Sequence, residues 1–556
     1  MLAGNYRRFR LSSVEVKRRD GLARSGIYVS EGMSIEFPAA VDPGTIFPDL
    51  NHAALSNIPL SAGVEFVGNN WPDGAHNPVM IHPHHTAGPV SGDCVMVPGW
   101  HTVLNNPRNY VNWLTAMKAA VPPDTLWYAP AAAVPSNIHI LSYSGLDLFD
   151  FIACDLAAAR GVFLLPEGEF DLKWMEAGVC NCEGCRSANL KLHNRIALGK
   201  ELALVSRFIG ASRIRELVES RCRMHSAHVA IMRHLDSMYD LMEQVVPVAR
   251  DVPFGATTGE TLNRVEIRRF ARRVVDRYRP PLADTAVLLP CSARKPYSQS
   301  QSHNKFTRAI QGRAHELIVT SPVGLVPREL ELVYPAAHYD VPVTGYWDRE
   351  EKAFISGVIG EYLQKNCYRR VIAHLDGGAL DVAKSGAEIA GIDLEYTCPG
   401  RRPTDTASLL ALDTALEGCR RMKQDLIKGI CSWQFGTVPD IAGLVLRGRY
   451  PAVKYSRNRV QMFSLDTGTG LIRPTFEGWK LLGEGYRVQI SDFVPQGDIL
   501  APGIVSADPA IREGDEVLVV GPRVLGTGRA AMGAREMTRS KRGVAVRVRK
   551  IKMCSD

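Results

Sequence analysis

The sequence predicts a multidomain protein of the α/β class, and three observations support this prediction. A chain of 556 residues is too long for one hydrophobic core, and domain-size scaling suggests about three to five domains. Short apolar segments alternate with helix-compatible stretches over most of the chain, which favours parallel sheets. The C-terminal part instead alternates apolar and charged residues between glycine-rich turns, which is typical of an all-β domain.

Changes in these patterns divide the chain into four expected domains. Residues 1–248 contain apolar strand candidates such as DCVMVPG and FDFIACDL, and are expected to form a parallel sheet or barrel. Residues 249–400 contain three strand candidates separated by helical stretches and are expected to form a three-layer α/β core domain. Residues 401–478 resemble a small α+β unit, and residues 479–556 are expected to form a β-barrel-like domain.

One stretch of the first domain has helical periodicity without proline or glycine. It runs from Arg213 to Val246 and predicts one or two long helices. His225, His228 and His234 lie in it, and helix packing or exposure is the expected role of each.

Composition and charge restrict the class of protein. No stretch reaches the apolar length of a membrane span, and the basic N-terminus lacks the apolar core of a signal peptide, so a cytoplasmic protein without a membrane partner is expected. Twelve cysteines in so long a chain argue against a disulfide scaffold. Between Arg529 and Lys552 there are nine Lys or Arg residues and one acid, Glu536, which indicates a polyanion-binding surface.

The stretch from Leu288 to Phe306 is the strongest candidate for a reactive site. An apolar strand, TAVLLP, ends there in a polar loop, and open α/β sheets place their ligands at such strand ends. The reactive and polar side chains of this loop are Cys291, Ser292, Arg294, Lys295, Tyr297, Ser298, Ser300, Ser302 and His303.

Two further strand ends could complete a pocket around this loop. Ser321 with Pro322 follows the strand HELIVT, and His374 with Asp376 follows RRVIA. Because strand ends of one parallel sheet lie side by side, these groups are expected to converge. The segment between the two strands adds polar residues that could bind a cationic amine, cap helices or pair with arginine: Arg328, Glu329, His338, Tyr339, Asp340 and Asp348.

A cysteine cluster indicates a metal site. Cys180, Cys182 and Cys185 form a C-x-C-x-x-C pattern, and His193 follows eight residues later. Three thiolates and an imidazole suit tetrahedral zinc with every position filled, which is the pattern of a structural site. His225 is an alternative fourth ligand if the chain folds back.

These features resemble the archaeal tRNA-guanine transglycosylase superfamily and, within it, the archaeosine synthases. The block from DLFDF to CNCEGC, with LKLHN after it, is similar to the end of the transglycosylase barrel and its zinc site. CSWQFG and GLIRPTFEG resemble the accessory domain of these enzymes, and the segment from QGDIL to AREM resembles a PUA RNA-binding domain. The resemblance thus implies a degenerate TIM-barrel-like first domain with structural Zn²⁺ and a C-terminal PUA domain.

The most specific part of the resemblance is the reactive loop. The archaeosine synthase pattern P-C-S-x-x-K-P-Y-x-x-S-x-S-H is met at nine positions, which are Pro290, Cys291, Ser292, Lys295, Pro296, Tyr297, Ser300, Ser302 and His303. One departure from the transglycosylases concerns base exchange. Asp150 falls where their nucleophilic aspartate would lie, but the D-S-G-x-[FY]-Q segment that binds the incoming base is absent, and VMVPGWHTV occupies that region. Asp150 could be a relic, a helix cap or a base-binding group.

The resemblance implies a reaction on a base already present in tRNA. The substrate would be 7-cyano-7-deazaguanine at position 15, in the D-arm, and the enzyme would add an amine to its nitrile to give an amidine. The amine implied is the side-chain amine of free lysine, and a radical SAM enzyme would then cleave the adduct. Older interpretations of the family made the donor glutamine or ammonia. A homodimer is compatible with the sequence.

The residues can be assigned to this reaction. Cys291 could attack the nitrile to form a thioimidate, with Ser292 beside it and Lys295 lowering the thiol pKa or donating a proton. Tyr297 or His303 could also supply the proton. The alternative is direct attack by the amine, with Cys291 only packing at the strand end. The candidate substrate-binding residues are Arg294 or Arg328 for a carboxylate, Ser300 and Ser302, and Glu329, Asp340, Asp348 or Asp376 for an amine.

Two other functions compete with this one. A transglycosylase that retains base exchange is disfavoured by the missing D-S-G-x-[FY]-Q segment. A non-catalytic tRNA-binding protein is disfavoured because RNA binding alone needs no cluster of Cys, Ser, Lys and Tyr.

Overall fold

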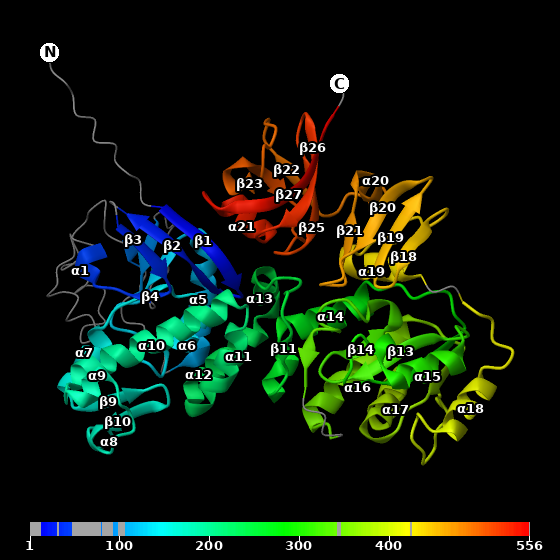
Figure 1. Ribbon diagram of the computed structural model, residues 1–556, viewed down its shortest axis with the longest axis horizontal. Helices are drawn as coiled ribbons and strands as arrows, with labels where there is room; N and C mark the ends of the chain where they lie inside the picture. Colours follow the sequence, from blue (N-terminus) through cyan, green and yellow to red (C-terminus); the bar gives the residue numbers. More distant parts are fainter. Residues whose placement is uncertain are drawn as a thin grey trace. The chain divides into compact units, whose positions relative to one another are not determined.

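The computed structural model describes residues 13–30, 33–46, 79–80, 93–97, 106–341, 346–422 and 425–554 (Figure 1). The chain divides into two compact units. The first contains residues 1–247, 499–504 and 532–545, and the second contains residues 248–498, 505–531 and 546–556. Both mix helices with sheets, so the predicted α/β class is confirmed. The boundaries of the four expected domains stay a prediction.

The first unit contains an antiparallel sheet and a parallel sheet. Strands β1 (Ser13–Asp20), β2 (Ala23–Ser30) and β3 (Met33–Phe37) form the antiparallel sheet in sequence order. The parallel sheet has the order β4-β8-β7-β6-β5. Its strands are β4 (Ala39–Ala40), β5 (Val79–Met80), β6 (Cys94–Met96), β7 (Leu126–Tyr128) and β8 (Leu148–Phe149). The first strand of this sheet pairs with the last, as in a closing barrel, but no pairing between β4 and β5 is present in the described residues, so the TIM-barrel-like fold stays a prediction.

Helices follow the parallel strands in the sequence, and further helices follow the last of these strands. They are α5 (Pro107–Ala120), α6 (Ile138–Tyr143), α7 (Ile152–Ala159), α10 (Leu190–Gly210), α11 (Ile214–Arg221), α12 (Ser226–Ser237) and α13 (Tyr239–Val245). Between α7 and α10 lie the hairpin of β9 (Val162–Leu165) with β10 (Gly168–Asp171) and the short α9 (Glu183–Arg186).

The expectation of one or two long helices from Arg213 to Val246 is wrong. The chain breaks at His225, which is extended with φ −137° and ψ 117°, and again at Met238, with φ −84° and ψ 46°. At the first break the carbonyl of His225 accepts the backbone N–H groups of His228 and Val229 and so starts α12. Neither break carries proline or glycine, so helical periodicity alone could not locate them.

A five-stranded sheet forms the core of the second unit, in the order β14-β13-β12-β16-β17. The strands are β12 (Thr285–Pro290), β13 (His315–Thr320), β14 (Gly324–Pro327), β16 (Arg370–Ala373) and β17 (Glu395–Tyr396). The neighbouring helices are α14 (Val265–Asp276), α15 (Gln301–Ile310), α16 (Arg349–Lys365), α17 (Gly377–Ala390) and α18 (Thr406–Ala415). Successive side chains of a strand point to opposite faces, and Val287 and Leu289 of β12 pack with Phe306 of α15 and Leu412 of α18 in one buried cluster. Helices α15 and α18 therefore cover that face of the sheet.

The remaining sheets of the second unit are antiparallel in most of their pairings. Helix α19 (Leu426–Phe435) precedes a sheet in the order β18-β19-β20-β21. Its strands are β18 (Val445–Arg449), β19 (Ala452–Arg457), β20 (Val460–Leu465) and β21 (Ile472–Pro474). The C-terminal sheet includes the order β27-β26-β25-β22-β24. Its strands are β22 (Arg487–Ile490), β24 (Ile504–Ala507), β25 (Glu516–Val520), β26 (Val524–Ala530) and β27 (Val544–Met553). The short helix α21 (Ala534–Arg539) belongs to the first unit.

Candidate functional site

The ends of three parallel strands meet around one cavity in the second unit. Strand β12 pairs in parallel with β13 on one side and with β16 on the other, so the carboxyl ends of all three lie at one edge of the sheet. Cys291 after β12, Ser321 after β13 and Asp376 after β16 all line a cavity of about 480 Å³. The structure thus brings together the three chain segments that the sequence placed at strand ends.

Cys291 is an exposed residue whose thiol lies against buried hydroxyl groups. Desolvation is the largest influence on this thiol and raises its pKa, while a hydrogen bond with Thr320 and the nearby charge of Lys295 act in the opposite direction. Lys295 donates a hydrogen bond to the carbonyl oxygen of Tyr339 (3.2 Å), and its ammonium lies 3.8 Å from the centroid of the Tyr339 ring. Burial lowers the pKa of Lys295. The positive charge of Lys295 favours the thiolate form of Cys291.

Carboxylates lie in the same cavity as the thiol. Asp348 is the N-cap of α16 and forms a capping box with Glu351, whose side chain accepts the backbone N–H of Asp348 (2.9 Å). The hydroxyl of Ser321 donates to the other oxygen of Glu351 (2.5 Å). Asp376 precedes α17, makes no side-chain cap hydrogen bond and is exposed. The cavity therefore combines a thiol with three acidic groups, which suits a cationic ligand.

Glu351 and Thr320 were not identified from the sequence as site residues. The spacing Asp348-x-x-Glu351 is a capping-box signal and could have predicted the start of α16. No local pattern marks Thr320, because it is one more β-branched residue of an apolar strand.

The later part of the reactive loop faces the protein interior. Ser300 is the N-cap of α15 and accepts the backbone N–H of His303, and the hydroxyl groups of Ser300 and Ser302 lie 3.1 Å apart. Tyr297 is fully buried, and its hydroxyl lies 3.0 Å from that of Tyr339. His303 is fully buried too. None of these four residues lines the cavity, so the structure gives Ser300 a capping role, with Ser302 beside it, and neither serine a contact with the cavity.

Arg328 holds a buried charge cluster on the interior side of the loop. Its guanidinium donates to Glu316 (2.5 and 2.9 Å) and Glu331 (2.9 Å). It also donates to Nδ1 of His303 (2.8 Å). Burial, together with the charge of Arg328, lowers the pKa of His303 to about 3, so this imidazole is neutral. The guanidinium of Arg328 is thus occupied by these partners and is not available for a bidentate pair with a substrate carboxylate.

The other predicted substrate-binding residues lie in different surroundings. Glu329 is buried and accepts the hydroxyl of Tyr278 (2.7 Å) with His315 beside it (3.2 Å), away from the cavity lining. Asp340 is exposed at the end of β15 (Tyr339–Asp340) and acts electrostatically on Lys295. Ser292 accepts the backbone N–H of Arg294 (3.3 Å), and the Arg294 side chain is exposed. None of these residues lines the cavity.

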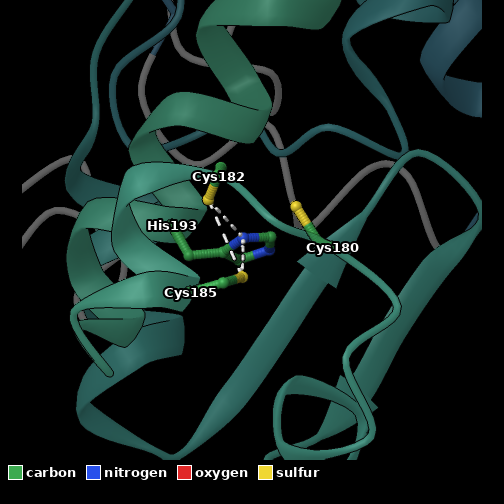
Figure 2. A group of neighbouring side chains, drawn as sticks. All are labelled: Cys180, Cys182, Cys185 and His193. Carbon is green, nitrogen blue, oxygen red and sulfur yellow. Dashed lines mark hydrogen bonds between the residues drawn. The ribbon is translucent and has the colours of Figure 1, made fainter.

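The predicted zinc ligands come together in the first unit (Figure 2). The ligand atoms of Cys180, Cys182, Cys185 and His193 lie within 4.8 Å of one another. The Cys182 and Cys185 sulfurs are 3.7 Å apart and lie 3.4 and 3.3 Å from Nδ1 of His193. Tetrahedral zinc with Zn–S of about 2.3 Å and Zn–N of about 2.0 Å needs separations of roughly 3.8 and 3.5 Å. The donor set and its spacing therefore fit zinc.

The orientation of His193 is fixed from outside the cluster. Its Nε2 lies 3.0 Å from the carbonyl oxygen of Leu164, so Nε2 carries the proton and Nδ1 is left to bind a metal. The ring also stacks on Phe163 at 3.9 Å. A side chain at Gly184 would lie 2.3 Å from the backbone nitrogen of His193, so glycine is needed where α9 passes α10.

His225, the alternative fourth ligand, lies elsewhere. Its ring packs against His228 at 4.6 Å, and His228 packs against His139 at 5.3 Å. His225 is not part of the cysteine cluster, so the structure favours His193.

Asp150 is buried, and its hydrogen bonds connect the segments that follow β7 and β8 of the parallel sheet. Its carboxylate accepts the hydroxyl of Tyr128 (2.7 Å) and the backbone N–H groups of Ala131 (3.0 Å) and Ile152 (2.9 Å). Burial raises its pKa to about 6, and these hydrogen bonds limit the rise. The carboxylate thus binds the first N–H of α7, although Phe151 and not Asp150 occupies the N-cap position. The VMVPGWHTV segment runs over residues 95–103, of which those from 98 onward lie outside the described residues.

The basic C-terminal region is divided between anchoring and exposed residues. Arg535 and Arg539 donate to backbone carbonyls at the end of α5, including that of Ala119 (2.7 and 2.6 Å). On β27 the predicted alternation is interrupted by a bulge in its pairing with β26, and Arg547 and Lys550 are exposed. No ion pair is found for these two residues among the described parts of the chain, so they can meet an external anion.

Comparison with known proteins adds to this geometry. Residues 267–416 match a domain of unknown function (DUF5591), and residues 487–552 match the PUA domain. The archaeosine synthase subunit alpha of Methanosarcina acetivorans is 40% identical over 499 residues and is covered to 80%, with 83% of this chain aligned. The chain belongs to the archaeosine synthase family.

Other relatives extend this family assignment. The archaeosine synthase of Haloferax volcanii is 36% identical, with 97% of this chain and 99% of that protein covered. The tRNA-guanine(15) transglycosylase of Methanothermobacter thermautotrophicus is 26% identical, with 95% of this chain and 77% of that protein covered. These matches confirm the predicted resemblance to the transglycosylase paralogues. The match to the PUA domain confirms that prediction for the C-terminal part of this archaeosine synthase family member. In the described residues, no helix combines the length and apolar character of a membrane span.

Proposed function

We propose that this protein acts in archaeosine biosynthesis and adds an amine to the nitrile of 7-cyano-7-deazaguanine in tRNA. The observation that carries the proposal is the cavity that Cys291 lines together with Asp348, Glu351 and Asp376. A thiol suits attack on an electrophilic carbon, and carboxylates suit a cationic amine donor. Relatives named archaeosine synthase over most of the chain support the assignment.

The proposed reaction has two steps. In the first, the Cys291 sulfur bonds to the nitrile carbon, and the thiol proton passes to the nitrile nitrogen to give a thioimidate. In the second, the amine attacks this carbon, the S–C bond breaks, and the proton lost by the amine returns to the sulfur. The product is an amidine, and the enzyme is regenerated without net gain or loss of atoms. In the competing route the amine attacks the nitrile directly and Cys291 makes no bond.

Lysine is the proposed donor because the cavity is acidic. Asp376 is exposed and Asp348 and Glu351 border the same space, so they can hold the α-amine while the side-chain amine reaches the reacting carbon. Arg294 is the proposed partner of the lysine carboxylate, since Arg328 is occupied within its buried cluster. Lys295 keeps its proposed role of stabilising the thiolate, and Ser292 lies in the same loop. Tyr297 and His303 are proposed to support this loop through their buried hydrogen bonds.

The other parts of the chain have proposed roles around this site. The PUA domain and the barrel-like first domain would bind the tRNA and its D-arm, and Zn²⁺ held by the cysteine cluster would pin α9 to α10 without taking part in the reaction. A separate radical SAM enzyme would act on the adduct. Asp150 is proposed to be structural, and base exchange is not proposed, because its carboxylate is buried and hydrogen-bonded.

Replacing Cys291 with alanine is expected to abolish formation of the lysine adduct. Loss of a covalent nucleophile usually costs several orders of magnitude in rate, here at least about 10³-fold. The measurement is mass spectrometry of tRNA carrying 7-cyano-7-deazaguanine after incubation with enzyme and free lysine. Cys367→Ala, at another exposed cysteine outside the cavity, is the matched control and should react normally. Near-normal turnover by Cys291→Ala would eliminate the thioimidate route, and absence of adduct with the unaltered enzyme would refute the proposed function.

Replacing Arg547 and Lys550 together with alanine is expected to weaken tRNA binding and to reduce its salt dependence. Each phosphate contact that is lost should lower the slope of log K against log salt concentration by about one. Filter binding between low and moderate salt measures this slope. The control is Lys480→Ala with Arg523→Ala, which removes the same charge from residues already paired with Glu477 and Asp492. Equal slopes for the two double variants would exclude β27 as a backbone-binding strand.

A further inference from the structure

A chain of buried hydroxyl groups lies behind the Cys291 thiol. Pro290 of β12 pairs with Val319 of β13, which places the next two residues, Cys291 and Thr320, beside each other at the strand ends. Thr320 favours the thiolate form of Cys291, and its Oγ1 lies 2.6 Å from the hydroxyl of Tyr339. The Tyr339 hydroxyl in turn lies 3.0 Å from that of Tyr297. Thr320 and Tyr297 are completely buried, and Tyr339 is 5% exposed. The chain therefore runs from the cavity wall into the interior without access to water along its length.

Besides the thiol and the Tyr339 hydroxyl, a backbone carbonyl can accept the single proton of Thr320. Its Oγ1 lies 3.3 Å from the carbonyl oxygen of Ser321, which can accept a hydrogen bond but cannot donate one. A neutral thiol can donate to Thr320, and Thr320 then donates to Ser321. A thiolate can only accept, so Thr320 must turn its proton toward the sulfur. In that state the oxygen of Thr320 is left to accept from Tyr339.

We infer that Thr320 is a positioning residue that redirects its hydrogen bond to the Cys291 thiolate. In this state Tyr297 donates to Tyr339, Tyr339 donates to Thr320, and Thr320 donates to the sulfur. No partner group has to move, because the hydroxyl hydrogens alone rotate. The inference goes beyond the proposed function by naming how the nucleophile is held in its charged form, and its catalytic meaning rests on that function. The proton released by the thiol goes to the nitrile nitrogen in the reaction, and to water when the free enzyme ionises.

The charged groups around the thiol act together with this series. Lys295 is the nearest cation and favours the thiolate, and Asp340 acts on Lys295 in turn. Across the cavity, Asp348 and Glu351 at the start of α16 and Asp376 before α17 are carboxylates that disfavour a negative sulfur. Because burial raises the pKa of Cys291, the thiolate needs a directed donor. Thr320 provides that donor on the side opposite the solvent.

The structure also ties Lys295 to the same tyrosine. Lys295 donates to the backbone oxygen of Tyr339 and lies over its ring, while the Tyr339 hydroxyl contacts Thr320. One residue thus supports both groups that stabilise the thiolate. Tyr339→Phe would keep the ring under Lys295 and remove only the hydroxyl.

The test measures how alkylation of Cys291 depends on pH, with iodoacetamide as the probe and peptide mass spectrometry as the readout. Only the thiolate reacts, so the midpoint of the profile reports the thiol pKa. A hydrogen bond to a charged group is worth about 1.5 to 3 kcal/mol, so Thr320→Val should raise the midpoint by about one pH unit or more. At a pH below both midpoints, this corresponds to alkylation slower by about tenfold. Thr320→Ser keeps the hydroxyl and should restore the original profile, and Tyr339→Phe should shift it in the same direction by less.

Two controls separate this role from a general disturbance of the fold. Cys367 is exposed and is alkylated in the same samples, and its profile should not change. Thr285→Val removes a buried hydroxyl from the opposite end of β12, where it lies near Cys419, and should leave the Cys291 profile unchanged. Identical Cys291 profiles for Thr320→Val and the unaltered protein would overturn the inference.

The alkylation experiment needs neither tRNA nor lysine, so its outcome is independent of the proposed function. If Thr320→Val shifts the profile while Cys291→Ala still forms the lysine adduct, the hydrogen-bond series stands and the thioimidate route fails. If the profile does not shift while Cys291→Ala is inactive, the nucleophile stands and the role of Thr320 fails. In the adduct assay, Thr320→Val should lower kcat more than it raises KM, and Thr320→Ser should recover most of kcat.

Discussion

Replacing His193 with alanine is expected to abolish zinc binding at the proposed structural site and to destabilise the first unit strongly. The imidazole is one of the four groups that form the proposed zinc site, and its Nε2 hydrogen bond to Leu164 holds Nδ1 toward the three thiols. Structural zinc sites contribute binding free energies of about 10 kcal/mol or more, which count as folding free energy because the unfolded chain lacks the site. The loss of one ligand should cost several kcal/mol of this. Elemental analysis of the purified protein and thermal unfolding measure the two effects.

His225→Ala is the matched control for this variant. His225 was the alternative ligand, but its ring packs on His228 outside the cluster, so zinc content should stay as in the unaltered protein. Cys182→Ser should behave like His193→Ala, because its sulfur lies 3.4 Å from the same nitrogen. A protein that retains full zinc after His193→Ala, or loses it after His225→Ala, would show that the fourth ligand is assigned to the wrong residue.

Replacing Arg328 with methionine should destabilise the second unit by about 3 to 5 kcal/mol. The methionine has a similar length, so the main change is that Glu316 and Glu331, both nearly fully buried, lose their cation. Glu331 still accepts the backbone N–H of Ser298 and the hydroxyl of Tyr450, but these neutral donors cannot replace a guanidinium. Urea unfolding followed by tryptophan fluorescence measures the loss.

Arg308→Met provides the comparison, because Arg308 is exposed on α15 and its replacement should change stability by no more than about 0.5 kcal/mol. Adding Glu316→Gln and Glu331→Gln to Arg328→Met should recover part of the loss if uncompensated charge is its cause. Equal unfolding midpoints for Arg328→Met and Arg308→Met would mean that the cluster does not hold the loop.

The meeting of Cys291, Ser321 and Asp376 could be predicted because it depends on a general property of parallel sheets. Three apolar segments separated by helical stretches predict neighbouring parallel strands, and their polar ends then share one edge. The clustering of Cys180, Cys182 and Cys185 could be predicted for a similar reason, since the close spacing of the three cysteines leaves few ways to place the thiols apart. In both cases the sequence pattern is short and the geometry that follows from it is nearly unique.

The division of the reactive loop could not be predicted. Nine matched positions between Pro290 and His303 suggest one cluster, but the chain turns into α15 after Ser300. Cys291 therefore lines the cavity, while His303 lies in the interior beside Arg328. Arg328 lies 25 residues farther along, so its pairing with His303 is a long-range contact that no local pattern specifies. Glu351 shows the same limit. Its capping box predicts where α16 begins, but only the packing of that helix against β14, the neighbour of β13, brings its carboxylate to Ser321.

The composition of the first unit has a consequence for synthesis. This unit includes residues 499–504 and 532–545 in addition to residues 1–247, and Arg19 pairs there with Glu536 (2.5 Å). Chains grow from the N-terminus at about 5 to 20 residues per second, and early domains usually fold while later ones are still being made. Here the early unit stays incomplete until residue 545 has left the ribosome, by which time the intervening second unit has almost entirely emerged. The last step of folding, in which these segments join the first unit, therefore takes place at the end of synthesis. A ribosome that stalls before residue 532 would hold an N-terminal unit that lacks residues 532–545.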